Sequence, residues 1–347
     1  MTTCLSVLGF AHAHVSTYCS RWVEMDDVQL VAGWDHDKER GEKSCANFGM
    51  EFVSEIDALL AREDVEAVVI GAETSLHAEL VVAAARAKKK IILQKPMALT
   101  LKEADQIVEA VEQNGVPFTL AWQMRLDPQN REIKRLLEQG ILGRIFMVRR
   151  RHGLATHLWP DFDKSWYVKR ECNRGMFADD AAHPVDFLYW LFGMPESVIA
   201  EIDTLLNPNI PDDNGIAIFR YPDGMFAEVV CSFTCSAGEN TTEIVGEKGV
   251  LIQNYGDGPS CGVPRPEGAV GLKWYLTEKG NWTYSDIPSP ASHGERIAGL
   301  ARPLIEFVRG ERPPICTAPE GRDSLRMVLG CYESAAQGKR ILLSSLR

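Results

Sequence analysis

The chain has 347 residues, of which 45% are hydrophobic and 24% charged, and its formal net charge is −11. This length predicts two domains, and the excess of acidic groups argues against nucleic acid or an anionic membrane as a partner. Nine cysteines without a CxxC pair, no long apolar segment and no signal-like start predict a cytoplasmic protein with reduced thiols.

The first part of the chain alternates short apolar runs with amphipathic segments. The predicted strands are 5–9, 28–34, 67–70, 91–93 and 118–121, and the predicted helices are 17–25, 37–48, 76–87 and 101–114. Strands that are apolar throughout and separated by helices are typical of a parallel sheet covered on both faces. The order predicts a Rossmann-type, doubly wound dinucleotide-binding domain over residues 1–122.

The pattern changes from residue 123 onward. We predict helices at 130–139 (ending at Gly140), 181–191, 295–309 and 320–337, and strands at 145–151, 197–205, 215–221, 225–233, 241–245 and 250–254. Turns at 222–224 and 247–249 place glycine where a positive φ is expected, and the Gly- and Pro-rich segment 258–268 is a predicted loop. Residues 123–347 are therefore predicted to form an antiparallel sheet with helices on one face.

The turn after the first strand partly matches a dinucleotide-binding fingerprint. Of the three glycines in G-x-G-x-x-G only Gly9 is present, because Ala11 and His14 occupy the other positions. A methyl group at Ala11 is a small change, and His14 at a helix N-terminus could bond a phosphate. Asp35 ends the second strand, where a carboxylate accepts hydrogen bonds from the hydroxyls of the adenosine ribose and repels a 2′-phosphate. This favours NAD over NADP. Asp37 is the better candidate for capping the next helix.

Three residues suit the oxidation of an alcohol. Lys95 follows an apolar strand, and Asp179 and His183 are four residues apart, which places them on one helical face. His183 is the natural base for a hydroxyl proton, and Asp179 can orient its ring. Lys95 can stabilise the developing negative charge on oxygen. Asp180 is expected to face elsewhere and cap the helix, and Asp186 could contact a substrate hydroxyl.

Several segments resemble those of the glucose-fructose oxidoreductase, inositol dehydrogenase and MocA (Gfo/Idh/MocA) family over nearly the whole chain. They are Gln94-Lys95-Pro96 (Glu-Lys-Pro in the family), the loop from Thr74 to His77, the strand end from Trp122 to Arg125, the stretch from Gly175 to Asp186 and the hairpin from Asn240 to Val250. The chain departs from the family in its glycine fingerprint, in Gln94 and in a single glycine at Asn173-Arg174-Gly175.

This resemblance implies a Rossmann domain, 1–122, and a substrate-binding and oligomerisation domain, 123–347, with a large, open, mostly antiparallel sheet. It implies NAD or NADP, a sugar, cyclitol or related polyol as substrate, and a homodimer or homotetramer formed through the open sheet. It also implies that Lys95, Asp179 and His183 are the catalytic residues. The predicted cofactor contacts are Gly9, Phe10, Ala11, His12, His14, Asp35, Ala72, Thr74, His77, Gln94, Lys95 and Gln123. The predicted substrate contacts are Lys95, Arg125, His152, Trp166, Asp179, Asp180 and His183.

Two alternatives remain open at this point. His12 and His14 resemble the His-x-His pair that opens metal-dependent amidohydrolase barrels, and His183, His293 and an aspartate could complete a zinc site. That interpretation leaves Lys95 and Asp35 without roles, so we predict no metal. The other alternative is a non-catalytic sensor of dinucleotide or sugar on the same fold, which would be expected to lose the three catalytic residues.

Overall fold

The computed structural model describes residues 2–236, 240–254, 271–290 and 292–346. Contacts within the chain divide it into two compact units. Unit 1 consists of the residues up to Gln123 with Glu171–Asn173 and Gly294–Leu325, and unit 2 consists of Met124–Arg170, Arg174–His293 and the residues from Arg326 onward. The domain boundary between residues 122 and 123 stays a prediction, and the predicted loop at 258–268 lies outside the described residues.

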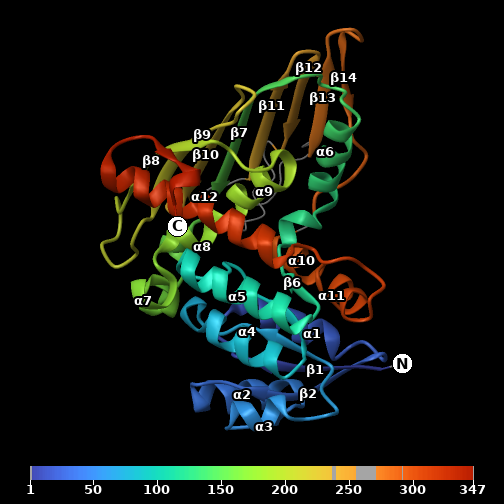
Figure 1. Cartoon of the computed structure of the whole chain (residues 1–347). Helices are drawn as coiled ribbons and strands as arrows, with labels where there is room; N and C mark the ends of the chain where they lie inside the picture. Colours follow the sequence, from blue (N-terminus) through green and yellow to red (C-terminus); the bar gives the residue numbers. More distant parts are fainter. Residues whose placement is uncertain (1, 237–239, 255–270, 291, 347) are drawn as a thin grey trace. The chain divides into compact units, whose positions relative to one another are not determined.

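Unit 1 is built on a parallel sheet that has six strands in the described part of the chain, in the order β3-β2-β1-β4-β5-β6. Figure 1 labels three of them, β1, β2 and β6. The strands are β1 (Thr3–Leu8), β2 (Val28–Trp34), β3 (Glu51–Phe52), β4 (Ala67–Ile70), β5 (Lys90–Leu93) and β6 (Phe118–Leu120). Every neighbouring pair is parallel, and the direction of winding reverses between β1 and β4. The predicted doubly wound sheet is therefore confirmed, and β3 is an additional short edge strand.

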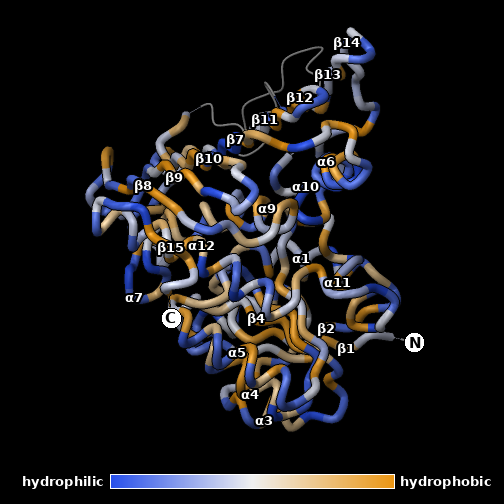
Figure 2. The backbone as a smooth tube through the Cα atoms, turned by 45° about the horizontal axis from the view of Figure 1, so that its top comes forward, coloured by the Kyte–Doolittle hydropathy of each residue, from blue (hydrophilic) through white to orange (hydrophobic). Residues whose placement is uncertain are grey.

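Helices connect these strands, as their amphipathic patterns predict. They are α1 (Ala13–Trp22), α2 (Lys38–Phe48), α3 (Ile56–Leu60), α4 (His77–Arg86) and α5 (Leu101–Asn114). Thr100 and Glu103 form a capping box at the start of α5, and Gly115 ends it with a φ of +62°. The apolar strands form the core: β4 is fully buried, and Figure 2 shows its hydrophobic character.

Unit 2 contains a mixed sheet with nine strands among the described residues, in the order β14-β13-β12-β11-β7-β10-β9-β8-β15. The strands are β7 (Ile145–Gly153), β8 (Ser197–Asp203), β9 (Asn214–Arg220), β10 (Phe226–Ser232), β11 (Thr241–Gly246), β12 (Gly249–Gln253), β13 (Leu272–Leu276), β14 (Asn281–Tyr284) and β15 (Ile341–Leu342). Only β7 and β10 pair in parallel within the described sheet. The mostly antiparallel open sheet is thus confirmed.

The helices after residue 123 are more broken than their sequence pattern suggests. They are α6 (Pro128–Glu138), α7 (Arg170–Asn173), α8 (Met176–Asp180), α9 (Ala182–Phe192), α10 (His293–Ala298), α11 (Ala301–Val308) and α12 (Ala318–Gln337). The helix predicted at 295–309 is two helices, interrupted at Gly299 and Leu300, because glycine weakens a helix interior. Gly140, with a φ of +65°, follows α6 as predicted. None of the helices in the described residues is both long and apolar enough to cross a membrane.

The two predicted hairpin glycines have different roles. Gly224 has a φ of +94°, which confirms the first prediction. The prediction of a positive φ at Gly249 is wrong. A Cβ atom there would instead lie 2.0 Å from the carbonyl oxygen of Tyr275 on the next strand, β13. Glycine is needed at this position because the neighbouring backbone comes too close for any side chain.

One buried histidine ties two loops of unit 1 together. The ring of His77 is fully buried, with Nδ1 2.9 Å from the carbonyl oxygen of Pro96 and Nε2 3.2 Å from that of Ala72. These carbonyls belong to the loops that follow β5 and β4. Burial lowers the pKa of His77 to about 4, although the carbonyl contacts act in the opposite direction. At neutral pH the ring is a neutral imidazole with one N–H, so it donates a hydrogen bond to one of these two carbonyls and packs against the other.

This pKa makes the stability of unit 1 depend on pH. In the unfolded chain His77 takes up a proton at the ordinary histidine pKa of about 6.5, whereas in the folded chain it does so only near pH 4. The neutral ring therefore contributes its full stabilisation above about pH 6.5, and this contribution is lost as the pH falls from about 6.5 to about 4. We expect the free energy of unfolding to fall by roughly 2 kcal/mol more between about pH 7 and about pH 5 in the native protein than in His77→Asn.

Urea unfolding followed by circular dichroism at the two pH values measures the difference. His157→Asn, which removes a half-buried histidine from unit 2, is the matched control. An equal pH dependence in the native protein and in His77→Asn would contradict the assignment.

Candidate active site

The turn after β1 lies very close to the loop after β4. Gly9 has a φ of +85°, and a Cβ atom there would lie 2.5 Å from Ala72, so only glycine fits. At Gly71 a Cβ atom would lie 2.2 Å from Cγ2 of Val15 in α1. In the usual fingerprint the third glycine allows α1 to pack closely on the sheet. In this chain His14 stands at the third position, and Gly71 makes the room for the close packing of α1. The positive φ at the first fingerprint position and the close packing of α1 are thus both present although two of the three glycines are missing.

His12 and His14 lie at the start of α1. Nδ1 of His12 accepts a hydrogen bond from the backbone N–H of His14 at 3.3 Å, which caps the helix. The two buried rings are in edge-on contact, with centroids 4.4 Å apart. The N-terminal end of a helix can attract a phosphate through its backbone N–H groups and the helix dipole. Contacts of Phe10, Ala11, His12 and His14 with a dinucleotide remain predictions.

The fold excludes the amidohydrolase alternative. That class needs a closed barrel of alternating strands and helices, whereas the parallel sheet of unit 1 is open, with β3 and β6 at its edges. Across the described ranges no group of three or more His, Cys, Asp or Glu side chains is arranged to hold a metal ion. His12 acts as a helix cap in this fold.

Asp35 lies at the end of β2, and its carboxylate is completely enclosed. Oδ1 accepts hydrogen bonds from the backbone N–H of Asp37 at 2.9 Å and from Nη2 of Arg40 at 2.7 Å. Oδ2 accepts hydrogen bonds from the backbone N–H of Phe10 and from Nε of Arg40, both at 2.8 Å. Asp37 caps α2, as predicted. The contact of Asp35 with a ribose remains a prediction.

Sequence reasoning missed the partners of Asp35. Arg40 also donates to Glu73, which follows β4, from Nη1 at 2.9 Å and from Nη2 at 3.3 Å. The spacing of Asp35 and Arg40, five residues apart across a helix start, does not reveal this pairing. A signal was present in Glu73 itself, because a carboxylate beside a buried strand end usually has a cationic partner.

The other predicted cofactor residues of unit 1 also follow its parallel strands. Gln94 and Lys95 follow β5 and are 0% and 3% exposed, and the Lys95–Pro96 peptide is cis. Thr74 follows β4, and its hydroxyl donates to Oδ1 of Asn173 at 2.8 Å. Gln123, which is fully buried, follows β6. The structure therefore brings these residues to the carboxyl edge of the sheet, where ligands bind in doubly wound folds.

In unit 2, one carboxylate lies beside two imidazoles. Oδ2 of Asp180 is 3.1 Å from Nε2 of His152 on β7, and Oδ1 is 3.5 Å from Nε2 of His183 on α9. The two rings are stacked with centroids 5.7 Å apart. All three side chains are buried, as is that of Asp179. The helix α9 packs across β7 and β10, and the buried side chain of His152 lies on the face of β7 that this helix covers.

Two expectations about this segment are corrected. Asp180 does not face away as a helix cap, since it contacts both His152 and His183. Asp179 and His183 do not share one helix, because α8 ends at Asp180 and α9 begins at Ala182. Ala181, which joins the two helices, keeps right-handed helical angles, so the spacing of the two residues stays close to that of a helix. The orienting role of Asp179 remains a prediction.

Arg125 and Asp186 form a buried ion pair. Nε and Nη2 of Arg125 donate to the two carboxylate oxygens of Asp186 at 2.9 and 2.8 Å, and both side chains are almost fully enclosed. This fork-shaped pairing is strong and geometrically specific. It ties the segment after β6 to α9 one turn beyond His183. Contact of either residue with a substrate stays a prediction.

Trp166 belongs to a cluster of half-exposed aromatic rings. Its ring stacks on that of Tyr167 at 4.0 Å, Tyr167 stacks on Phe162 at 5.9 Å, and Phe162 meets Trp159 edge-on at 5.4 Å. Trp159 is 43% exposed. Exposed aromatic faces of this kind can stack on the apolar face of a sugar ring. Contact of Trp166 with a substrate stays a prediction.

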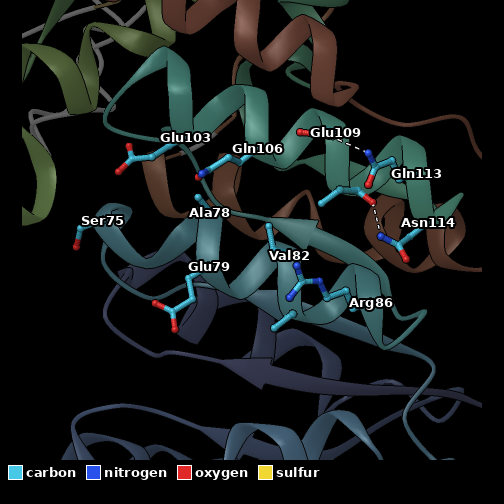
Figure 3. Close-up of a pocket in the computed structure, with 12 residues that line it drawn as sticks. Ser75, Ala78, Glu79, Val82, Arg86, Glu103, Gln106, Glu109, Gln113 and Asn114 are labelled. Atoms are coloured by element: carbon cyan, nitrogen blue, oxygen red, sulfur yellow. Dashed lines mark hydrogen bonds between the residues drawn. The ribbon is translucent and has the colours of Figure 1, made fainter.

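A groove of about 650 Å³ lies between α4 and α5 (Figure 3). Charged and amide side chains from the two helices line it, including Glu79, Arg86, Glu103 and Glu109. None of the predicted cofactor or substrate residues is among its lining residues. It is a furrow between two neighbouring helices on the outside of unit 1.

Two family matches cover most of the chain. Residues 6–121 match the oxidoreductase family with an NAD-binding Rossmann fold, and residues 130–252 match the GFO/IDH/MocA C-terminal domain. The chain is 26% identical to the 1,5-anhydro-D-fructose reductase of Ensifer adhaerens, over 93% of this chain and 95% of that enzyme. It is 25% identical to the myo-inositol 2-dehydrogenase of Thermotoga maritima, over 93% of each.

Solved structures have the same fold. The WlbA dehydrogenase of Bordetella pertussis, in complex with NADH and UDP-GlcNAcA, has a TM-score of 0.80 and 25% identity, over 99% of each chain. An oxidoreductase of Agrobacterium radiobacter, in complex with NAD+, L-tartaric acid and magnesium, has a TM-score of 0.84 and 20% identity, also over 99% of each chain. The chain therefore belongs to the Gfo/Idh/MocA family of oxidoreductases, and its unit 1 carries the NAD-binding Rossmann fold of that family.

Proposed function

We propose that this protein is an NAD-dependent dehydrogenase or reductase that transfers a hydride between nicotinamide and a secondary hydroxyl or keto carbon of a sugar, cyclitol or related polyol. The observation that carries the proposal is Lys95, a lysine only 3% exposed at the carboxyl end of β5 in an NAD-binding domain. A buried amine at that edge has a clear use in stabilising an alkoxide. The names of the relatives, a sugar reductase and an inositol dehydrogenase, support the substrate class.

The residues of unit 1 fit a dinucleotide. Gly9 has a φ of +85°, which lets the turn after β1 pack directly against Ala72, and α1 begins soon after this turn. We propose that the turn and the start of α1 hold the pyrophosphate, and that Ala72, Thr74, His77, Gln94 and Gln123 line the nicotinamide half. Carboxylates at Asp35 and Glu73 favour NAD over NADP, because they repel a 2′-phosphate.

We propose that Lys95, Asp179 and His183 act on the same substrate carbon. In the oxidative direction, His183 accepts the proton of the hydroxyl group. Lys95 donates a hydrogen bond to the oxygen while the carbonyl bond forms. The bound nicotinamide supplies the hydride acceptor, so the C–H electron pair leaves with the hydride and a ketone remains. Reduction uses the same groups in reverse, with His183 returning the proton.

The substrate contacts are proposals of the same kind. Arg125, His152, Trp166 and Asp180 are the predicted contacts beyond the catalytic residues, and they suit a molecule with many hydroxyl groups. We set aside the sensor alternative because the chain keeps Lys95, Asp179 and His183 and belongs to an oxidoreductase family.

We further propose a cytoplasmic homodimer or homotetramer with domains 1–122 and 123–347. One face of the sheet in unit 2 exposes apolar side chains: Ile216 is 47% exposed, Ile218 40% and Phe226 46%. The intervening Ala217 is buried, so the strands alternate between a covered and an open face. An exposed apolar sheet face of this kind is suited to contact with a second copy.

The direct test is a screen of sugars, sugar acids and inositols for reduction of NAD, followed by the absorbance of the reduced nicotinamide, with NADP in parallel. We expect turnover with at least one polyol and a preference for NAD. Absence of turnover in both directions across such a panel, together with no binding of NADH, would refute the proposed function.

Lys95→Ala and His183→Ala test the catalytic residues. Each should lower kcat by about 10²–10⁴-fold, because a general base or a charge-stabilising donor is worth that much. NADH binding and the circular dichroism spectrum should be retained in His183→Ala. Lys102→Ala, which removes an exposed lysine from α5, is the control. Unchanged turnover in either catalytic variant would remove that residue from the proposal.

Asp180 is proposed to position His183 by holding it together with His152. Asp180→Asn keeps the shape but removes the negative charge and replaces one acceptor oxygen with an N–H donor, so it cannot accept hydrogen bonds from both rings in the same way, and kcat should fall by about 10–100-fold, as for other supporting carboxylates. His152→Gln should also lower kcat. Because the residues act as one unit, the double variant should lose little more than Asp180→Asn alone. Losses that multiply in the double variant would contradict the coupling.

Ile218→Glu tests the open sheet face. A charge placed at this face should separate the assembled protein into smaller species, since a buried unpaired carboxylate is costly. Light scattering after size-exclusion chromatography measures the mass. Leu205→Glu, which changes a leucine that is 70% exposed, is the control and should keep the native mass. An unchanged mass in Ile218→Glu would place the interface elsewhere.

A further inference from the structure

The carboxylate of Asp35 has no remaining capacity to accept hydrogen bonds. A carboxylate offers about four acceptor positions, and Asp35 uses four, two for backbone N–H groups and two for Arg40. The backbone bonds come from Phe10 and Asp37 and are part of the local fold. The two bonds from Arg40 are the ones that a bound ribose would have to replace.

Glu73 determines what happens to Arg40 when it leaves Asp35. The guanidinium already donates to both oxygens of Glu73, at 2.9 and 3.3 Å. The guanidinium of Arg40 can therefore leave Asp35 and remain paired with Glu73. Without a second carboxylate, the same movement would leave a partly buried charge unpaired, which is far more costly. The side chain of Arg40 is 25% exposed and that of Glu73 is 8% exposed, so both groups are partly shielded from solvent.

We propose that Glu73 and Arg40 determine the choice between NAD and NADP in this protein, an inference that rests on the proposed function. Glu73 holds the guanidinium after Asp35 exchanges it for the two ribose hydroxyls, and this favours NAD. A 2′-phosphate would need the same guanidinium for itself, and Glu73 competes for it. Glu73 also adds a second negative charge beside Asp35, which repels the phosphate.

The other groups near this ion pair do not reverse its charge. Asp37 caps α2, and His36 lies 3.5 Å from both Asp35 and Glu73 with 46% of its side chain exposed. With Asp35, Glu73 and Asp37 negative and Arg40 positive, the cluster stays acidic when His36 is neutral. Arg40 is the cation that the structure places between Asp35 and Glu73.

Two substitutions should change cofactor choice in opposite directions. Glu73→Gln leaves Arg40 available to a 2′-phosphate, so the ratio of the Kd for NADPH to the Kd for NADH should fall by about tenfold. Arg40→Gln leaves two carboxylates without their cation, so the same ratio should rise by about tenfold. In the double variant the gain in NADPH binding should disappear, because it depends on Arg40.

Nicotinamide fluorescence titrations with NADH and NADPH measure these ratios without any turnover, and circular dichroism checks the fold. Glu39→Gln removes the same charge from an exposed side chain next to Arg40 and should leave the ratio unchanged. Should Arg40→Gln fail to fold, Arg40→Lys keeps the charge but cannot bridge two carboxylates with a planar fork, and it should shift the ratio in the same direction as Arg40→Gln.

The outcomes separate this inference from the proposed function. Binding of NADH by the native protein with an equal change for both cofactors in Glu73→Gln overturns the inference alone. A shift in Glu39→Gln as large as that in Glu73→Gln does the same. A native protein that binds neither dinucleotide overturns both.

Discussion

Parallel strands end at the same edge of a sheet, and the predicted cofactor site depends on this constraint. Gly9, Asp35, Ala72 and Gln94 follow β1, β2, β4 and β5, and they come from separate parts of the sequence. The edge is also tightly built. Gly9 touches Ala72 closely enough to exclude a side chain, and the backbone of Phe10 donates to Asp35. A change in one of these loops therefore acts directly on its neighbours.

Buried charge explains why so many of the predicted ligand contacts already have partners inside the protein. A carboxylate or guanidinium removed from water is costly unless it is paired and hydrogen-bonded. Asp186 is paired with Arg125, Asp180 lies beside two imidazoles, and Asp35 is saturated by Arg40 and the backbone. Such pairing fixes the side chains before a ligand arrives, which reduces the reorganisation that binding and catalysis require. Where the ligand needs the same atoms, as at Asp35, the pairing becomes a means of selection.

The glycines show how backbone packing can preserve a motif that the sequence has partly lost. The first fingerprint glycine is kept because Ala72 leaves no room for a side chain. The third is replaced by His14, and the close approach of α1 depends on Gly71 at the end of another strand. A motif read along the chain cannot reveal such a substitution, because the compensating residue is adjacent in space and distant in sequence.

The amino-acid sequence by itself determined the two sheet types, most helices, the cap at Asp37 and the strand ends that carry Lys95 and Asp35, because these follow from local periodicity and turn chemistry. It also carried the family resemblance that the matches confirm. Only the tertiary structure decided that Asp180 faces His152 and His183, that α8 and α9 are separate, and that Arg40 bridges Asp35 and Glu73. These contacts join residues from different elements, and the need to pair buried charges selects among many sequence-compatible partners only once the elements have packed.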